Sequence, residues 1–290
     1  GQIGRHSGMR TIIVVALLVA APFANAAELV RLVRLKLAAG DLYTGAHAAE
    51  EHRIATGTDG EYWDAIGWLA RGAQMFGKAD LAREYVAQLK RAIPAETKEL
   101  LTPYGAAIEV EGRLIAEEQG RGAAIRYFQD QLAKAQATSL RSRIRKNIDL
   151  LTLEGQPAPE IDGKLEALRG KPVLLYFFAE WCGDCKAQAS TLERVWSRYG
   201  DRIGMIAVTR LYDDEKPEEE KAKVAKAWSE TYGGLADVPV VIDTDAMVRY
   251  GASATPTFAL VDQRGIVQLY TPTRLSEAEL SRRIEGMLGQ

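Results

Sequence analysis

Only two cysteines occur in this chain of 290 residues, and two residues separate them within the segment Trp181-Cys182-Gly183-Asp184-Cys185. The apolar run Val173 to Ala179 predicts a strand that ends just before them. If Cys182 opens the helix that follows, its sulfur lies near unsatisfied backbone N–H groups and the positive end of the helix dipole, which favour the thiolate. Such a thiolate can attack a disulfide, and Cys185, one helical turn along, can resolve the mixed disulfide. We therefore predict that Cys182 attacks, that Cys185 resolves, and that the two close a redox-active disulfide.

Three other uses of the pair are a structural disulfide, half of a zinc site and two inert buried thiols. Zinc needs about four ligands, and the histidines, His6, His47 and His52, lie far upstream with no second cysteine pair. A structural bridge that closes so small a loop would constrain the unfolded chain very little. We predict no metal site.

Composition and charge exclude several classes of protein. With 47% hydrophobic and 26% charged residues, the chain is ordinary globular material with room for two cores. Its net charge of −2 creates no field that would attract nucleic acid or an anionic membrane. We find no nicotinamide or flavin fingerprint, so we predict no cofactor and expect an unidentified partner protein to donate electrons.

The N-terminal segment has the pattern of a targeting signal. Met9-Arg10, the apolar run Thr11 to Phe23 and Ala24-Asn25-Ala26 read as a signal peptide over residues 9–26, with the mature chain starting at Ala27. Residues 1–8, before the apparent start methionine, are set aside as a cloning remnant or upstream residues. We expect export to a bacterial periplasm or cell envelope, the alternative being an uncleaved membrane anchor. In that oxidising setting the pair rests as a disulfide unless a partner reduces it.

Residues 27–153 have apolar positions at helical spacing and predict a helical domain. Gly40, Gly77 and Gly120 recur at roughly the period of paired-helix repeats. The middle unit resembles a tetratricopeptide repeat, although Ile66 and Ala73 replace the customary Trp and Tyr. Positions of that repeat are matched by Leu69, Ala70, Gly77, Ala82, Val86 and Pro94.

Two features of this half suggest either packing or binding. Its aromatic residues either fill the seam between helices, which we favour, or line a peptide groove for a protein partner. The basic cluster Arg141 to Lys146 is predicted to be the solvated face of a last, capping helix. The aromatic residues are Tyr62, Trp63, Trp68, Phe76, Tyr85, Tyr104, Tyr127 and Phe128.

The segment Glu154 to Glu160 breaks the helical pattern, because Pro157 and Pro159 remove N–H donors and favour an extended chain. We place the domain boundary here. Short apolar runs then alternate with helices, which predicts an α/β sheet over residues 154–290.

This second domain resembles the thioredoxin fold and, within it, the TlpA-like family of exported thiol-disulfide oxidoreductases, over roughly Gly155 to Gly289. A lone Cys-x-x-Cys is a weak signal, but here several local features accompany it. They are the entry Pro157 to Pro159 with Gly170-Lys-Pro-Val, the Trp-Cys-x-x-Cys motif, an extra helix and strand over Glu218 to Ile242, and Tyr250 to Phe258 followed by Val261 to Gly265.

The resemblance also implies roles around the cysteine pair. Pro256 is expected to be cis and to lie against the pair, presenting the Thr255 backbone as an edge for an extended substrate. Trp181 is expected to form the rim where substrate docks. An ordinary trans proline is the alternative.

The sequence departs from the family pattern at several positions that are expected to affect the pKa or the redox potential of the cysteine pair. Asp184 stands where many relatives have proline; its charge either raises the pKa of Cys182 and favours a reductant, or merely satisfies the helix N-terminus. Tyr176 occupies the position of a buried carboxylate, and a phenol is no base near neutral pH. Glu180 and the acidic loop Asp213 to Glu220 are substitute candidates, the loop being more typical of solvated surface.

These observations predict an exported thiol-disulfide oxidoreductase that reduces disulfides of a protein client, with the helical domain recruiting a partner. The alternative is a helical-repeat interaction protein with an adaptor or redox-gated thioredoxin-like domain. A third hypothesis, a thiol peroxidase, fits the Trp-Cys-x-x-Cys context poorly.

Overall fold

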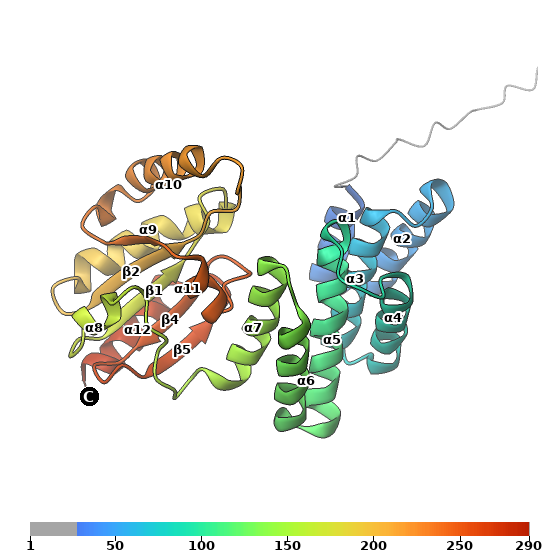
Figure 1. Ribbon diagram of the computed structural model, residues 1–290, viewed down its shortest axis with the longest axis horizontal. Helices are drawn as coiled ribbons and strands as arrows, with labels where there is room; N and C mark the ends of the chain where they lie inside the picture. The colour runs from blue at the N-terminus through green and yellow to red at the C-terminus, as the bar shows by residue number, and fades with distance from the viewer. Residues whose placement is uncertain (1–27, 290) are drawn as a thin grey trace, which may run out of the picture.

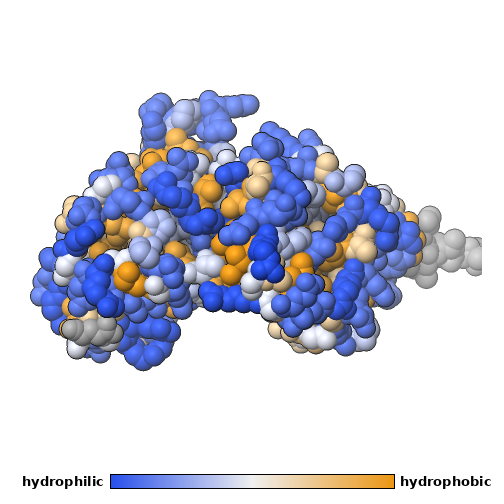
Figure 2. Space-filling view, turned by 60° about the horizontal axis from the view of Figure 1, so that its bottom comes forward, coloured by the Kyte–Doolittle hydropathy of each residue, from blue (hydrophilic) through white to orange (hydrophobic). Residues whose placement is uncertain are grey.

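The computed structural model describes residues 28–289, and the predicted signal peptide and residues 1–8 lie outside this range. One half of the molecule consists of helices, the other of a sheet covered by helices, and α7 lies between them (Figure 1). As a space-filling surface, the halves form two lobes with a notch between them (Figure 2). Within residues 28–289 no helix combines the length and apolar composition needed to cross a bilayer.

The helical half is a series of antiparallel helix pairs. The turns between α1 and α2, α3 and α4, and α5 and α6 contain Gly40, Gly77 and Gly120, whose φ values of 77°, 70° and 88° favour glycine. The pairs are compatible with the expected repeat, and tetratricopeptide membership stays a prediction. The helices are α1 (Glu28–Ala38), α2 (Leu42–Thr56), α3 (Gly60–Met75), α4 (Ala79–Ala92), the short η1 (Lys98–Leu100), α5 (Leu101–Gln119), α6 (Arg121–Lys134) and α7 (Thr138–Thr152).

The aromatic residues of this half fill its core more than they line a groove. Tyr62, Tyr85 and Phe128 are buried, and most of the others pack partly buried against two apolar clusters. Phe76, at the end of α3, is an exposed exception. The seam interpretation is therefore confirmed for most of this set.

Helix α7 differs from the prediction. Lys146 and Ser142 are buried, and Arg143 is largely covered, so the cluster Arg141 to Lys146 is not a solvated face. The prediction was wrong because α7 packs between α5 and α6 on one side and the sheet half on the other. Two of its basic side chains, Arg143 and Lys146, converge on the buried carboxylate of Glu109.

The second half contains a five-stranded sheet in the order β3-β2-β1-β4-β5, with helices on both faces, and the α/β class is confirmed. Strand β1 pairs parallel with β2 and antiparallel with β4, so it lies at the centre. The elements are α8 (Lys164–Ala167), β1 (Val173–Phe177), α9 (Gly183–Tyr199), β2 (Gly204–Thr209), α10 (Pro217–Thr231), η2 (Gly233–Leu235), β3 (Val240–Ile242), α11 (Thr244–Arg249), β4 (Thr257–Val261), β5 (Val267–Thr271) and α12 (Glu277–Leu288).

Alternation along β1 creates the two cores. Leu174 and Tyr176 face the cluster built with α9, α10 and α12, whereas Leu175 and Phe177 face the cluster built with α11. Every residue of β1 is buried, as expected for a strand covered on both sides. The strand thereby delivers the cysteine segment to the sheet edge where β1 ends.

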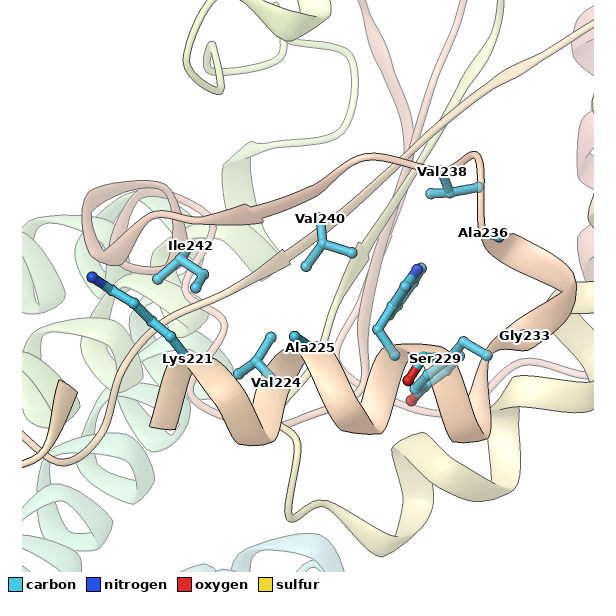
Figure 3. A pocket seen from close by; sticks show the side chains of 11 residues that line it. Lys221, Val224, Ala225, Ser229, Gly233, Ala236, Val238, Val240 and Ile242 are labelled. Carbon is cyan, nitrogen blue, oxygen red and sulfur yellow. The ribbon is translucent and has the colours of Figure 1, made fainter. Parts of the chain in front are cut away.

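The extra helix and strand form an apolar groove at the sheet edge. Helix α10 lies along β3, and Val224 and Ala225 face Val240 and Ile242 across it (Figure 3). The groove measures about 540 Å³. Tyr232 also lines it, which links the groove to the core beneath the cysteines.

The two halves meet through α7. This helix contacts α11 and β5, and Gly251 approaches it so closely that an added Cβ would lie 2.3 Å from the backbone nitrogen of Lys146. The backbone N–H of Tyr270 donates to the carboxylate of Glu154 at 3.0 Å. Packing and a polar contact therefore join α7 and the segment after it to the sheet half.

Candidate functional site

The cysteine pair stands at the start of α9, directly after β1. Cys182 and Cys185 form a disulfide with a Cα–Cα distance of 5.2 Å. Cys182 is the N-cap residue of α9, and its Sγ accepts a hydrogen bond from the backbone N–H of Cys185 at 3.1 Å. Cys185 is fully buried, whereas Cys182 is 6% exposed. Cys182 therefore offers the more accessible sulfur, next to a helix N-terminus that favours a thiolate.

The loop before β4 lies against this sulfur. The Thr255–Pro256 peptide bond is cis, as the resemblance implied. The carbonyl oxygen of Thr255 lies 3.3 Å from Cys182 Sγ. The structure thus brings Cys182, Thr255 and Pro256 together from segments more than 70 residues apart.

Trp181 lies beside the disulfide and is 58% exposed. Its ring meets the ring of Tyr212 edge-on, with centroids 5.4 Å apart. The Arg210 guanidinium covers the Tyr212 ring at 4.1 Å. Tyr212 thus supports the exposed tryptophan from the loop between β2 and α10, a role that the sequence analysis missed.

One residue of the predicted acidic loop explains how Tyr212 is held. The carboxylate of Glu220 accepts hydrogen bonds from the backbone N–H groups of Tyr212 and Asp213, at 2.8 to 2.9 Å. Glu220 is only 5% exposed, while residues 213–219 are exposed as predicted. The signal in the sequence was the acidic run Asp213 to Glu220, but the sequence does not reveal which of its glutamates is buried.

Tyr176 lies beneath Cys185. Its hydroxyl donates to the carbonyl oxygen of Cys185 at 3.1 Å and is 2.9 Å from the hydroxyl of Tyr232. Burial raises the pKa of Tyr176 well above its ordinary value and raises the pKa of Tyr232 to about 12. Neither phenol can therefore act as a base near neutral pH.

Asp184 and Glu180, the other two residues predicted to affect the redox properties of the pair, lie close to Cys182 in the sequence. Asp184, in the first turn of α9, has a side chain that is 70% exposed, and its carboxylate lies 3.8 Å from the guanidinium of Arg274. Glu180 is half-buried between β1 and Trp181. Among residues 28–289 no group of three or more His, Cys, Asp or Glu side chains gathers in a way that could hold a metal ion.

Comparison with known proteins identifies the part of the chain that carries this site. Residues 149–270 match the AhpC/TSA family. This stretch is an AhpC/TSA family domain. The thioredoxin-like protein YneN of Bacillus subtilis is 27% identical over 141 residues, which cover 46% of this chain and 79% of YneN.

A second relative and a solved structure are similar to the same part of the chain. The thiol-disulfide oxidoreductase ResA of Geobacillus thermodenitrificans is 25% identical over 141 residues, or 48% of this chain and 72% of ResA. A crystal structure of a protein from Chlorobium tepidum, described as a putative thiol:disulfide interchange protein DsbE, is 24% identical with a TM-score of 0.40, covering 47% of this chain and 98% of that one. The AhpC/TSA domain thus has thioredoxin-like thiol-disulfide oxidoreductases as relatives, and these matches span less than half of the chain.

Proposed function

We propose that this chain is an exported thiol-disulfide oxidoreductase that reduces disulfides in a client protein. We assign its mature part to a helical domain over 27–153 and a catalytic domain over 154–290. The observation that carries the proposal is the position of Cys182, capping α9 with its sulfur beside the Thr255 carbonyl and with Cys185 buried behind it.

The reaction is a two-step thiol-disulfide exchange that starts from the dithiol form. The Cys182 thiolate attacks one sulfur of the client disulfide; a bond forms between them, and the client's other sulfur leaves as a thiolate. Cys185, losing its proton to solvent, then attacks Cys182, which closes the intramolecular disulfide and expels the client's second thiol. The client gains two electrons and the Cys182–Cys185 pair loses them, so a dithiol electron donor must reduce the pair before the next cycle.

Two features support the docking roles within this reaction. Trp181 is exposed beside the disulfide and supported by Tyr212, and Thr255 presents a backbone edge to an extended client. The N-terminal segment, which reads as a signal peptide, motivates the envelope setting, and we propose that the helical half recruits the client or another protein.

Substitution of the two cysteines tests the proposal. With dithiothreitol as donor, we expect Cys182→Ser to abolish reduction of insulin disulfides, because no attacking thiolate remains. Cys185→Ser should instead accumulate a mixed disulfide with its client in the cell envelope, which mass spectrometry can identify. An unchanged rate of insulin reduction in Cys182→Ser contradicts the proposal, whereas partner capture that survives loss of both cysteines favours the adaptor hypothesis.

A further inference from the structure

A cavity of about 510 Å³ lies where the helical half meets the loop that precedes β4. It is lined from α3, α5 and α7 on one side and by Ser253 and Ala254 on the other. Its charged lining residues are four cations, Arg71, Arg113, Arg143 and Lys146, and one anion, Glu109. We call these four cations and their cavity the cationic pocket.

Glu109 cannot balance this charge. Its carboxylate lies within 3.0 to 3.4 Å of nitrogen atoms from all four cations. Burial acts to raise its pKa, but Lys146, Arg71 and Arg113 together lower that pKa to about 2. Glu109 is therefore ionised. Burial lowers the pKa of Lys146, although Glu109 acts to raise it, and the three arginines alone outnumber the single carboxylate, so the lining residues retain an excess of positive charge.

The cations are covered but incompletely paired. The side chains of Arg71, Arg143 and Lys146 are 15%, 13% and 11% exposed. Within the described residues the Nη2 of Arg143 is buried without a hydrogen-bond partner. The Nε of Arg71 makes no hydrogen bond either, although it forms an ion pair with the Glu109 carboxylate at 3.4 Å. A buried donor without an acceptor is costly, so a further acceptor in the cavity would stabilise the Arg143 guanidinium.

The pocket is built to hold these groups in place. The guanidinium of Arg71 stacks over the ring of Trp68 at 4.8 Å. Arg143 Nη1 donates to the carbonyl oxygen of Thr102, and it lies where a Cβ on Gly105 would come within 2.9 Å. Glycine inside a helix is less favourable than alanine, and here it leaves room for the guanidinium.

The location of the pocket indicates its occupant. Ser253 and Ala254 are followed directly by Thr255, whose carbonyl oxygen touches Cys182 Sγ. Since consecutive Cα atoms are about 3.8 Å apart, a client docked along this loop reaches the pocket within a few residues of its disulfide. Guanidinium groups with free N–H donors match carboxylates in charge and in geometry.

We propose that the cationic pocket binds carboxylate side chains of an acidic segment in the client, close in sequence to the disulfide that is reduced. The inference rests on the proposed function for its redox step, and the binding itself is independent of that step. The pocket thereby selects clients by charge, and the helical half takes part in substrate recognition.

Binding of two cysteine-free peptides to the oxidised full chain tests the pocket without redox chemistry. One peptide carries several Asp and Glu residues, and the other carries Asn and Gln at those positions. We expect the acidic peptide to bind at least tenfold more tightly in isothermal titration calorimetry at low salt. Arg71→Gln and Arg143→Gln should each weaken its binding about tenfold.

The control variant is Arg126→Gln, which removes an exposed arginine of α6 outside the pocket lining and should change binding less than twofold. Because Arg143 also holds the Thr102 carbonyl, Arg113→Gln at the pocket rim, with a side chain 33% exposed, provides a second test and should cost about fivefold. Any of three results would overturn the proposal: equal affinity for the two peptides, equal losses of affinity in Arg113→Gln and Arg126→Gln, or full displacement of the acidic peptide by inorganic phosphate at the peptide's own concentration.

A second arm separates the pocket from the redox function. Disulfide-containing versions of the two peptides are reduced by the wild type, and the ratio of their kcat/KM values is compared with that of Arg113→Gln. We expect the wild type to reduce the acidic peptide with a kcat/KM about tenfold higher than that for the neutral peptide. This ratio should fall about fivefold in Arg113→Gln. If the acidic peptide binds more tightly but neither peptide is reduced, the proposed function is contradicted and the pocket proposal is supported. If both peptides are reduced without a charge preference, the pocket proposal is contradicted and the proposed function is supported.

Discussion

At Cys182 two local effects act on the thiolate in opposite directions. The Cys185 N–H donates to its sulfur from the first turn of α9, which stabilises negative charge there. Asp184 places a second negative charge in the same turn, but its carboxylate is exposed and lies near Arg274. Solvent and Arg274 therefore screen much of that repulsion.

We expect Asp184→Asn to lower the pKa of the Cys182 thiol slightly, because removal of a nearby negative charge favours the thiolate and the charge is screened. The redox potential should rise by no more than about 30 mV, the equivalent of a tenfold change in the equilibrium constant, since the thiolate of the reduced form is stabilised. The pH dependence of alkylation of the reduced protein measures the pKa. Asp201→Asn is the matched control, since Asp201 also lies 3.8 Å from an arginine but follows the C-terminal end of α9, far from Cys182 in the helix. An identical pKa in both variants means that Asp184 serves only the helix terminus.

Individual residues of the site were predictable where a local rule fixes them. The Cys-x-x-Cys spacing after an apolar run was enough to place Cys182 at a helix start. The position of Tyr176 beneath the cysteine pair was expected, but its hydrogen-bond partner was not. That partner, Tyr232, comes from the segment after α10, 56 residues away. No periodicity in a sequence encodes such a pairing.

At the scale of elements, the loop between β2 and α10 controls the rim of the site. Glu220, in the first turn of α10, accepts from two backbone N–H groups of that loop, and the loop carries Tyr212 to Trp181. Hydrogen bonds from N–H groups to a carboxylate are among the stronger ones in proteins. The position of Trp181 thus depends on α10, which the sequence presented as an extra element.

We expect Glu220→Gln to raise the KM for a disulfide-containing peptide about three- to tenfold and to change kcat less than twofold. The amide of glutamine keeps one acceptor oxygen, and its NH₂ group opposes a backbone donor, so the loop loses its fixed conformation. Steady-state kinetics on the wild type and variant measure both parameters. The control is Glu219→Gln, whose carboxylate is exposed in the same turn. A fall in kcat with an unchanged KM contradicts a docking role for this loop.

The alternation of strands and helices followed from hydrophobic patterns, and the orientation of charged faces did not. Short apolar runs alternating with helices were expected over residues 154–290, and helices such as α9 and α12 agree with this, because their apolar spacing and capping are local properties. Helix α7 was misjudged because its basic residues become buried only when α5 and Gly251 pack around it. Burial of a charge depends on a partner from elsewhere in the chain, which a local pattern cannot supply.

At the scale of the whole molecule, α7 is shared by the two halves. One side of it places Arg143 and Lys146 in the cationic pocket, and another places Arg145 and Asp149 toward the sheet half. Asp149 is only 1% exposed; its Oδ1 accepts from Arg145 at 3.0 Å, and its Oδ2 lacks a partner within the described residues. The junction therefore contains a carboxylate that is poorly compensated when ionised.

This carboxylate gives stability a defined pH dependence. Burial raises the pKa of Asp149 from 3.8 to about 7, although Arg145 acts to lower it. Between these values the folded state holds a proton that the unfolded state has lost, so the stabilising contribution is complete below about pH 4 and disappears as the pH rises through 7. The difference is at most about 4 kcal/mol, since each unit is worth about 1.4 kcal/mol.

We expect Asp149→Asn to gain about 2 to 4 kcal/mol of stability relative to the wild type as the pH rises from 4 to 8, because the neutral amide has no charge to bury. Urea unfolding of both proteins across this range measures the gain, and the difference between them cancels the other titrating groups. The control is Asp130→Asn, whose exposed carboxylate pairs with Lys134 one turn along α6, and its difference should stay within about 0.5 kcal/mol. A flat difference for Asp149→Asn means that Asp149 is ionised in the folded state throughout, and that Arg145 compensates it fully at the junction.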